Sequence, residues 1–312
     1  MIDWNEILLK NEKELKEDHT SCKANFRVGF TYYKLEQHKK AIPYLKRAIK
    51  LNPNFSGAYN MLGIIYNNLK RPKEAILVLK KAIKLDTNDD NSYCNLGIAY
   101  RNLKYYEKAI STFKQAIRLV PYPDYYYYLG ETYYALKCYK EAISTLKQAI
   151  EKDPQFSEAY YLLCDSYGRL ERYEESIAIC KKLIQEDFTD AVLKPNHAIS
   201  HFYLGLNYHK LGRYEEAINS YKQAIKLDPN DKYNYKHLGE TYNELKLYGK
   251  AISSFKKAIK LDPGYAKAYY NLGMSYMLNN NEKSALKIYE FLKKTNQDLA
   301  HKLYDFIYKK QN

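Results

Sequence analysis

Three histidines in the second half of the chain have a spacing that could hold a metal ion. His197 and His201 lie four residues apart, so one face of a helix would present both, and His209 follows two turns later. A zinc site needs three or four ligands, and no aspartate or glutamate stands at a suitable companion spacing. We therefore predict no metal site.

The cysteines could supply metal ligands or redox chemistry, but their spacing argues against both. They are odd in number, widely separated and contain no CxxC pair. We interpret them as buried or incidental thiols in a reducing compartment. The five are Cys22, Cys94, Cys138, Cys164 and Cys180.

Motifs for catalysis are missing from the sequence. It contains no GxSxG motif, no glycine-rich phosphate loop and no HExxH. Carboxylates such as Glu131 and Asp165 recur on surface stripes, where we expect solvation rather than a pKa matched to proton transfer. We predict that the protein is not an enzyme and has no cofactor.

Tyrosine dominates the candidates for recognition. The segment PYPDYYYYLGETYYALKCYKEAI, residues 121–143, contains four tyrosines in a row. Consecutive helix residues turn by about 100°, so these four point to different sides and cannot form one platform. Tyr127, Glu131 and Tyr134 share one stripe of the helix. A second set has the spacing i, i+3, i+4, i+7 that is typical of core packing. That set is Tyr126, Leu129, Gly130 and Tyr133.

The elements that position these residues form an internal repeat. A small residue recurs at steps of 34, 34, 33, 34, 41, 34 and 34 residues, with a tyrosine three residues later. Apolar residues follow a 3.6-residue spacing twice in each repeat, which predicts a pair of amphipathic helices. The recurring small residues are Gly29, Gly63, Gly97, Gly130, Cys164, Gly205, Gly239 and Gly273.

The repeated segments include YNMLGIIY (Tyr59–Tyr66), YKHLGETY (Tyr235–Tyr242) and AISTF (Ala109–Phe113), and prolines such as Pro229 close many repeats. This pattern resembles the tetratricopeptide repeat, which has a 34-residue period and the signature W-x2-L-G-x2-Y, A-x3-F and P. The resemblance covers nearly the whole chain. It implies an all-α fold, a right-handed α-α superhelical solenoid of about eight tetratricopeptide repeats with terminal capping helices.

The expected organisation follows from the repeat positions. An N-terminal capping helix occupies residues 1–21, and the end of a C-terminal capping helix occupies residues 300–312. Eight repeats fill residues 22–299, with an insertion at 191–197. The repeats are 22–55, 56–89, 90–122, 123–156, 157–190, 198–231, 232–265 and 266–299.

The insertion accounts for the 41-residue step. We expect the first helix of the sixth repeat to start near Pro195 and to run to Leu211, because proline suits the first turn of a helix. The insertion is either a loop without a role, or an irregularity that separates five repeats from three and alters the groove.

In the resembled family the first helices line an inner concave surface, and the stripe of Tyr127 would face that groove. Cys94 belongs to the same stripe in the third repeat. Aromatic residues left there would serve as anchors for a ligand, unless the curvature of the superhelix partly buries them against neighbouring repeats. The predicted peptide-binding residues are Phe26, Phe30, Tyr33, Asn60, Asn67, Arg101, Tyr127, Glu131, Tyr134, Tyr161, Asp165, Phe202, Lys236 and Tyr270.

The formal net charge of +14 raises the alternative of an anionic partner. Lysines recur late in the second helices, where the helix dipole stabilises each by about 0.3–1 kcal/mol, so much of the charge has a structural explanation. We therefore predict a noncatalytic protein–protein interaction scaffold that binds a peptide or helical segment in its groove. The alternative is binding of RNA, DNA or lipid through the lysine-rich second helices.

The partner and the location follow from the same residues. Acidic residues near Tyr127 and Tyr161 favour a peptide with basic and aromatic side chains, and nucleic acid is the less favoured partner. No run of about 18 apolar residues and no signal segment occur, so we expect a cytoplasmic protein without transmembrane insertion. The oligomeric state stays open.

Overall fold

The computed structural model describes residues 2–185 and 194–308. These residues form eighteen α-helices and no strand, which confirms the all-α prediction for the described part of the chain. The chain divides into two compact units, Met1–Ala159 and Tyr160–Asn312.

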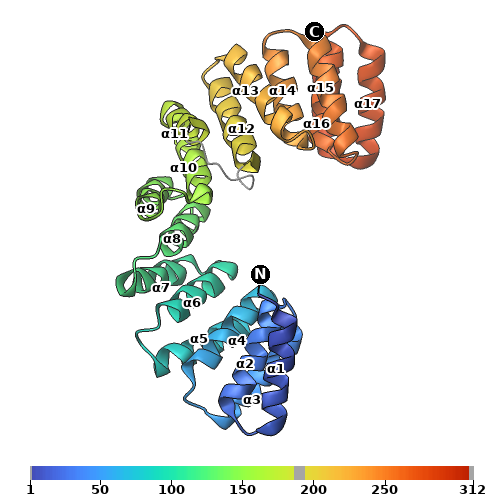
Figure 1. Cartoon of the computed structure of the whole chain (residues 1–312). Coiled ribbons are helices and arrows are strands. Elements are labelled where there is room, and N and C mark those ends of the chain that lie inside the picture. Colours follow the sequence, from blue (N-terminus) through green and yellow to red (C-terminus); the bar gives the residue numbers. More distant parts are fainter. Residues whose placement is uncertain (1, 186–193, 309–312) are drawn as a thin grey trace. The chain divides into compact units, whose positions relative to one another are not determined.

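The first unit consists of a single helix followed by helix pairs, and Figure 1 shows consecutive helices lying side by side. Its helices are α1 (Trp4–Glu17), α2 (Cys22–Lys34), α3 (His38–Leu51), α4 (Ser56–Asn68), α5 (Pro72–Leu85), α6 (Asp90–Asn102), α7 (Tyr106–Leu119), α8 (Pro123–Ala135) and α9 (Tyr139–Lys152). The division between the units falls in the first turn of α10 (Ser157–Arg169).

The second unit continues the alternation of first and second helices and ends on a single helix. Its helices after α10 are α11 (Tyr173–Gln185), α12 (Lys194–Lys210), α13 (Tyr214–Leu227), α14 (Lys232–Glu244), α15 (Tyr248–Leu261), α16 (Ala266–Leu278), α17 (Glu282–Thr295) and α18 (Gln297–Tyr308). The predicted end of the last repeat at residue 299 lies inside α18. The division into eight repeats remains a prediction.

The recurring glycine lets the two helices of a pair approach closely. A Cβ atom added at Gly63 would lie 2.4 Å from Leu79 Cγ, and one added at Gly97 would lie 2.6 Å from Phe113 Cε1. Only a glycine leaves room for a large side chain from the second helix at this point. The six such pairs are Gly29–Leu45, Gly63–Leu79, Gly97–Phe113, Gly130–Leu146, Gly205–Tyr221 and Gly239–Phe255.

The last glycine of the series is covered by a different element. A Cβ atom added at Gly273 would lie 2.5 Å from Leu303 Cδ2, which belongs to α18. Leu303 is fully buried together with Leu292 and Ile307. Helix α18 therefore occupies the position that a second-helix side chain takes in other pairs, which explains why the sequence of α17 departs from the pattern.

Every turn between paired helices contains one residue in the left-handed region. Its φ lies between 55° and 73°, although only one of these residues is a glycine. The turns therefore share one backbone geometry that their varied sequences did not indicate. The residues are Glu36, Lys70, Lys104, Lys137, Glu171, Gly212, Lys246 and Asn280.

The predicted packing of the tyrosine run is wrong at Tyr126, and Tyr133 is only partly buried against the core. Tyr126 is half-buried, whereas Tyr125 is only 5% exposed and lies in the core of the first unit. Other repeats place a small residue at this position, such as Ala58 and Ala268. Tyr125 fits because its hydroxyl reaches α6 and donates a hydrogen bond to Asp90. Spacing within one helix could not reveal this contact between neighbouring first helices.

The insertion is described only from its fourth residue. Residues 191–193 lie outside the described residues. Helix α12 begins at Lys194 and ends at Lys210, which confirms that the first helix of this pair starts early. It has 17 residues where the first helices of other pairs have 13, so the insertion lengthens this helix.

Candidate functional site

The fourteen predicted groove residues share one degree of burial. All of them are half-buried, and all lie on first helices: α2, α4, α6 and α8 in the first unit, and α10, α12, α14 and α16 in the second. Cys94, which we expected on the same stripe, is buried instead, with 6% of its surface exposed. The contacts of these residues form separate local clusters within each unit.

Aromatic rings gather at the start of the first unit. Phe30 lies 6.4 Å from Phe26 and 6.1 Å from Trp4 of α1, measured between ring centroids. Tyr33 lies 6.4 Å from Phe30, and the Lys34 ammonium sits 5.4 Å from the centroid of Phe30. Helix α1 thus covers part of the predicted groove surface in this repeat.

Amide groups connect the second and third repeats of the first unit. Asn67 Nδ2 donates to the backbone oxygen of Asn95 at 2.9 Å, and Asn95 Nδ2 donates to Asn60 Oδ1 at 3.1 Å. Asn67 Oδ1 is buried without a hydrogen-bond partner. Two of the predicted groove residues are therefore used to hold α4 against α6.

Arg101 and Glu131 form an ion pair between α6 and α8. The Arg101 guanidinium also lies 5.4 Å from the ring centroid of Tyr128. The negative charge of Glu131, which we expected to attract a basic ligand, is thus balanced within the chain. Asp124 and Glu158 remain exposed in this region.

Tyr127 and Tyr134 each pack against a second aromatic ring. Tyr127 lies 5.1 Å from Phe156, and Tyr134 lies 5.4 Å from Tyr139. Burial, followed by the charges of Glu131 and Glu158, raises the pKa of Tyr127 to about 12. Tyr127 is therefore a neutral hydrogen-bonding group at physiological pH, with part of its ring covered.

In the second unit, α10, α11 and α12 line a small cavity of about 170 Å³. Asp165 and Arg169 lie on its wall and form an ion pair at 3.5 Å. Cys164, Tyr203 and Asn207 also line it. Tyr161 stacks on Tyr203 at 6.4 Å.

A larger cavity of about 690 Å³ lies on α12, α14 and α16. Leu206, Met274 and Leu278 contribute apolar surface, and Lys236 and Glu240 contribute charge. Lys236 is the one predicted groove residue that lines it. Tyr270 packs instead against the C-terminal core, and Phe202 lies 5.5 Å from His237.

Glu240 accepts contacts from three side chains at this cavity. Lys236 Nζ lies 2.8 Å from its Oε1, Asn271 Nδ2 donates to Oε1 at 2.7 Å, and His237 Nδ1 lies 2.8 Å from Oε2. Burial alone would raise the pKa of Glu240, but the contacts with His237 and Lys236 outweigh it and lower the pKa to about 2. The cavity thus holds a fixed, ionised carboxylate.

Glu240, Asn271 and Met274 line this cavity but were not among the fourteen predicted peptide-binding residues. Glu240 and Met274 occupy the stripe of Tyr127 in the last two repeats, and Asn271 lies beside it. The stripe position alone indicated them, but it did not distinguish them from stripe residues that contact neighbouring helices.

The three histidines considered as metal ligands, His197, His201 and His209, all lie on α12. His209 Nδ1 lies 3.0 Å from Thr241 Oγ1, and burial lowers the pKa of His209. Burial likewise lowers the pKa of His201. The described residues contain no group of three or more histidine, cysteine, aspartate or glutamate side chains that could hold a metal ion.

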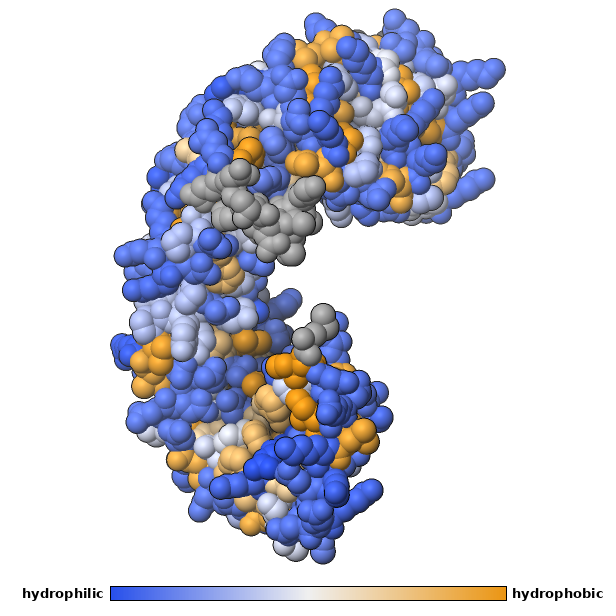
Figure 2. All heavy atoms as spheres, viewed as in Figure 1, coloured by the Kyte–Doolittle hydropathy of each residue, from blue (hydrophilic) through white to orange (hydrophobic). Residues whose placement is uncertain are grey.

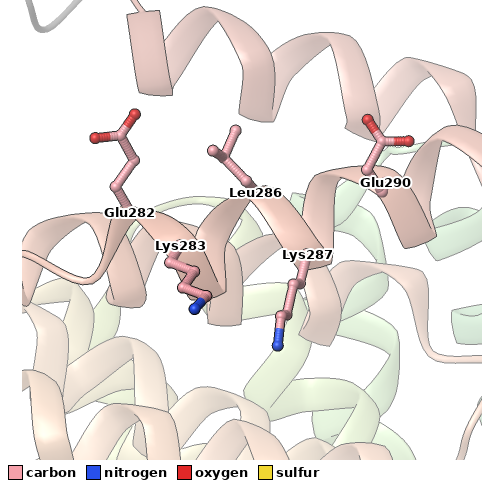
Figure 3. A pocket seen from close by; sticks show the side chains of 5 residues that line it. All are labelled: Glu282, Lys283, Leu286, Lys287 and Glu290. Atoms are coloured by element: carbon pink, nitrogen blue, oxygen red, sulfur yellow. The ribbon is translucent and has the colours of Figure 1, made fainter.

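One further depression is lined by α17 alone. Figure 3 shows Glu282, Leu286 and Glu290 on one side of this helix, with Lys283 and Lys287 pointing to another. Among the described residues no side chain from a second helix lines it, so it lacks the convergence that is typical of a ligand site.

Lysine and arginine side chains cover the signature tyrosine in each predicted repeat. Their charged groups lie 4.5–6.0 Å from the ring centroids. The pairs are Tyr32–Lys40, Tyr66–Arg71, Tyr100–Lys108, Tyr133–Lys114, Tyr167–Arg172, Tyr208–Arg213, Tyr242–Lys250 and Tyr276–Lys256. Part of the positive charge is therefore engaged in cation–π contacts within the chain. Hydrophilic residues cover most of the face shown in Figure 2.

No helix in the described ranges combines the length and the apolar character that a bilayer crossing demands.

Family models match most parts of the chain. Models described as "Tetratricopeptide repeat" match residues 22–55, 44–76, 133–194 and 198–231, and one described as "TPR repeat" matches residues 239–280. A model described as "Anaphase-promoting complex, cyclosome, subunit 3" matches residues 73–149. No curated protein matches the chain.

Two solved structures are similar in fold. The crystal structure of the APC/C hetero-tetramer Cut9-Hcn1 matches with a TM-score of 0.58 and 19% identity, over 87% of this chain. The chain spans about half, 52%, of the length of that relative. The C-terminal part of a TPR repeat-containing protein from Cytophaga hutchinsonii matches with a TM-score of 0.58 and 20% identity, over 75% of this chain and 94% of that one.

Proposed function

The chain belongs to the tetratricopeptide repeat family, and on that premise we propose that it is a noncatalytic scaffold for protein–protein interaction. It binds a peptide or helical segment of a partner along the first helices of its repeats. The location we propose is the cytoplasm.

The observation that carries this proposal is the cavity of about 690 Å³ on α12, α14 and α16. Three successive first helices contribute to it, together with residues of the turn before α15 such as Lys246. A site built on rigid helices can hold an extended or helical segment in one orientation. Apolar side chains and a few polar groups converge there, as is typical of ligand sites.

The chemistry of the lining suggests what the segment contains. Leu206, Met274 and Leu278 would receive an apolar side chain, and methionine adapts readily to different shapes. Glu240 is already paired with Lys236 and in contact with His237, so it orients polar groups rather than attracting net charge.

The first unit supports a basic and aromatic segment in a different way. Tyr127 presents a partly covered ring, and Asp124 and Glu158 are exposed near it. Because Arg101 balances Glu131, a basic side chain of the partner would meet these two carboxylates instead.

Selection of peptides on the purified chain tests the proposal. Peptides from a random library are selected on the immobilised protein, and their affinities are measured for the wild type and for Leu206→Ala/Met274→Ala. We expect this double variant to weaken binding by about tenfold or more, because it removes the apolar anchor surface. Leu286→Ala on α17, which does not line this cavity, is the matched control and should leave the affinity unchanged.

A salt titration separates this function from binding of an anionic surface. Phosphate-driven binding falls steeply between about 50 and 200 mM salt, whereas a peptide held by apolar contacts should lose little affinity. Equal peptide affinity in the double variant and the wild type would reject the proposed cavity. Binding only of nucleic acid or anionic vesicles, with a steep salt dependence, would favour the alternative.

A further inference from the structure

One helix pair, α10 and α11, replaces the packing device that six other pairs share. In six pairs a glycine of the first helix meets a leucine, phenylalanine or tyrosine sixteen residues later. In the pair of α10 and α11 both positions are cysteines, Cys164 and Cys180. The small residue has become larger and the large one smaller, so the total volume is nearly conserved.

The two sulfur atoms lie in contact. Cys164 Sγ and Cys180 Sγ are 3.2 Å apart, and the two residues are 1% and 0% exposed. A disulfide bond needs a sulfur–sulfur distance of about 2.0 Å, so small side-chain rotations would close the gap. Both residues lie within the second unit.

Polar neighbours hold this pair in place. Ser176 Oγ donates to the backbone oxygen of Cys164 at 3.0 Å, and Asn207 Nδ2 donates to Ser176 Oγ at 2.8 Å. Ser176 stands where the other pairs have alanine, such as Ala109 and Ala217. The departure from the other pairs therefore involves side chains on three helices, α10, α11 and α12, and not the two cysteines alone.

The cavity of about 170 Å³ gives a route to Cys164, which lies on its wall. A small uncharged oxidant can enter a space of this size. The hydrogen bond with Cys164 and burial raise the pKa of Cys180 well above its ordinary value, so Cys180 stays a thiol at neutral pH. Cys164 is then the sulfur that meets the oxidant first.

We propose that Cys164 and Cys180 are an oxidation site at which a hydroperoxide, with hydrogen peroxide as the simplest case, forms a disulfide between α10 and α11. Cys164 attacks the peroxide: an S–O bond forms, the O–O bond breaks, and the released oxygen takes the thiol proton to leave as water. Cys180 then attacks the Cys164 sulfur, the S–S bond forms, the S–O bond breaks, and a second water leaves with the proton of Cys180. Two thiols and one hydrogen peroxide give one disulfide and two waters.

The bond would tie together two helices that are otherwise joined by packing and by the hydrogen bond from Ser176 to Cys164. It closes a loop of 16 residues, which limits the unfolded chain more than the folded one. It also fixes α10 against α11 at the wall of the cavity. This inference does not depend on the proposed peptide function.

The test treats the folded full-length chain with hydrogen peroxide, blocks the remaining thiols and maps the cysteines by mass spectrometry. We expect one linked peptide containing Cys164 and Cys180, with a mass loss of about 2 Da. The unfolding transition should rise by about 5 °C and return after reduction with dithiothreitol. Cys94 is the internal comparison, because it is buried without a nearby sulfur among the described residues.

Cys164→Gly/Cys180→Leu is the matched control, since it restores the pair that Gly29 and Leu45 form. It should fold, and peroxide should leave its unfolding temperature unchanged. Recovery of Cys164 and Cys180 as thiols while Cys22 and Cys138 are oxidised would overturn the proposal. A temperature rise of the same size in the control would overturn it as well.

Discussion

Glu240 illustrates how single residues define the larger cavity. It lies on α14 and takes contacts from Lys236 and His237 on the same helix and from Asn271 on α16. A carboxylate that is this buried would be costly without such partners. The network therefore joins two first helices and keeps one charge in a defined place.

The lowered pKa of Glu240 predicts a pH dependence of stability. The pKa falls from an ordinary 4.5 to about 2, so the ionised form stabilises the fold. This contribution is fully present above the ordinary pKa and is lost as the pH falls through the folded one. The free energy of unfolding should therefore differ between wild type and Glu240→Gln by a constant amount above about pH 5, and by less as the pH approaches about 2. Urea titrations at several pH values measure it, and a difference independent of pH would contradict the assignment.

Gly97 tests the close approach of paired helices. A Cβ atom there would lie 2.6 Å from the Phe113 ring, which cannot move because it is fully buried. Gly97→Ala should therefore cost about 1–3 kcal/mol of unfolding free energy. Gly249→Ala is the matched control, because no atom lies within 4 Å of the added group and alanine favours a helix by about 0.5–1 kcal/mol. Chemical denaturation measures both, and equal effects would reject the packing explanation.

At the scale of elements, the turns between paired helices share a strained residue. A left-handed conformation costs a residue with a side chain about 1–2 kcal/mol, while glycine adopts it freely. Seven of the eight turns contain such a side chain, and Gly212 has φ 73°. The turns are thus held by the helices they connect rather than by their own sequence.

Exchanging these residues predicts opposite changes in stability. Lys104→Gly should raise the unfolding free energy by about 0.5–1 kcal/mol, because relief of strain exceeds the entropy that glycine adds to the unfolded chain. Gly212→Ala should lower it by about 1 kcal/mol. Thermal or urea unfolding measures both variants. A loss of stability in Lys104→Gly would show that the turn is not strained.

How far the elements could be predicted depends on the range of the contacts involved. The helix pairs and the early start of α12 follow from local spacing and from Pro195. The turn geometry could not be predicted, because lysine and glutamate do not favour a left-handed conformation. The core position of Tyr125 and the cover of Gly273 by Leu303 depend on neighbouring elements, which periodicity within one helix does not report.

At the scale of the whole molecule, contacts within the chain explain much of the high tyrosine content and part of the positive charge. The chain contains 36 tyrosines, and one in each predicted repeat lies under a lysine or arginine. These contacts use part of the net charge of +14, which by itself pointed to an anionic partner. The charges that sequence reasoning assigned to a ligand are likewise shared within the chain, as Arg101 and Glu131 demonstrate.

The sequence could predict only the helix face on which the candidate site lies. All fourteen expected residues lie half-buried on first helices, but they serve different purposes there. Asn60 and Asn67 join neighbouring helices, while Lys236 lines the larger cavity. A sequence position specifies the face of a helix, but contacts with neighbouring helices determine which side chains on that face stay accessible to a ligand.

The central claim is that partners bind to the first helices around the larger cavity of the second unit. Photo-crosslinking tests it most directly, with a benzophenone amino acid placed at Met274 in one variant and at Leu286 of α17, outside the cavity, in another. We predict that a selected peptide is captured at Met274 and not at Leu286. Capture at Leu286 with none at Met274 would contradict the account.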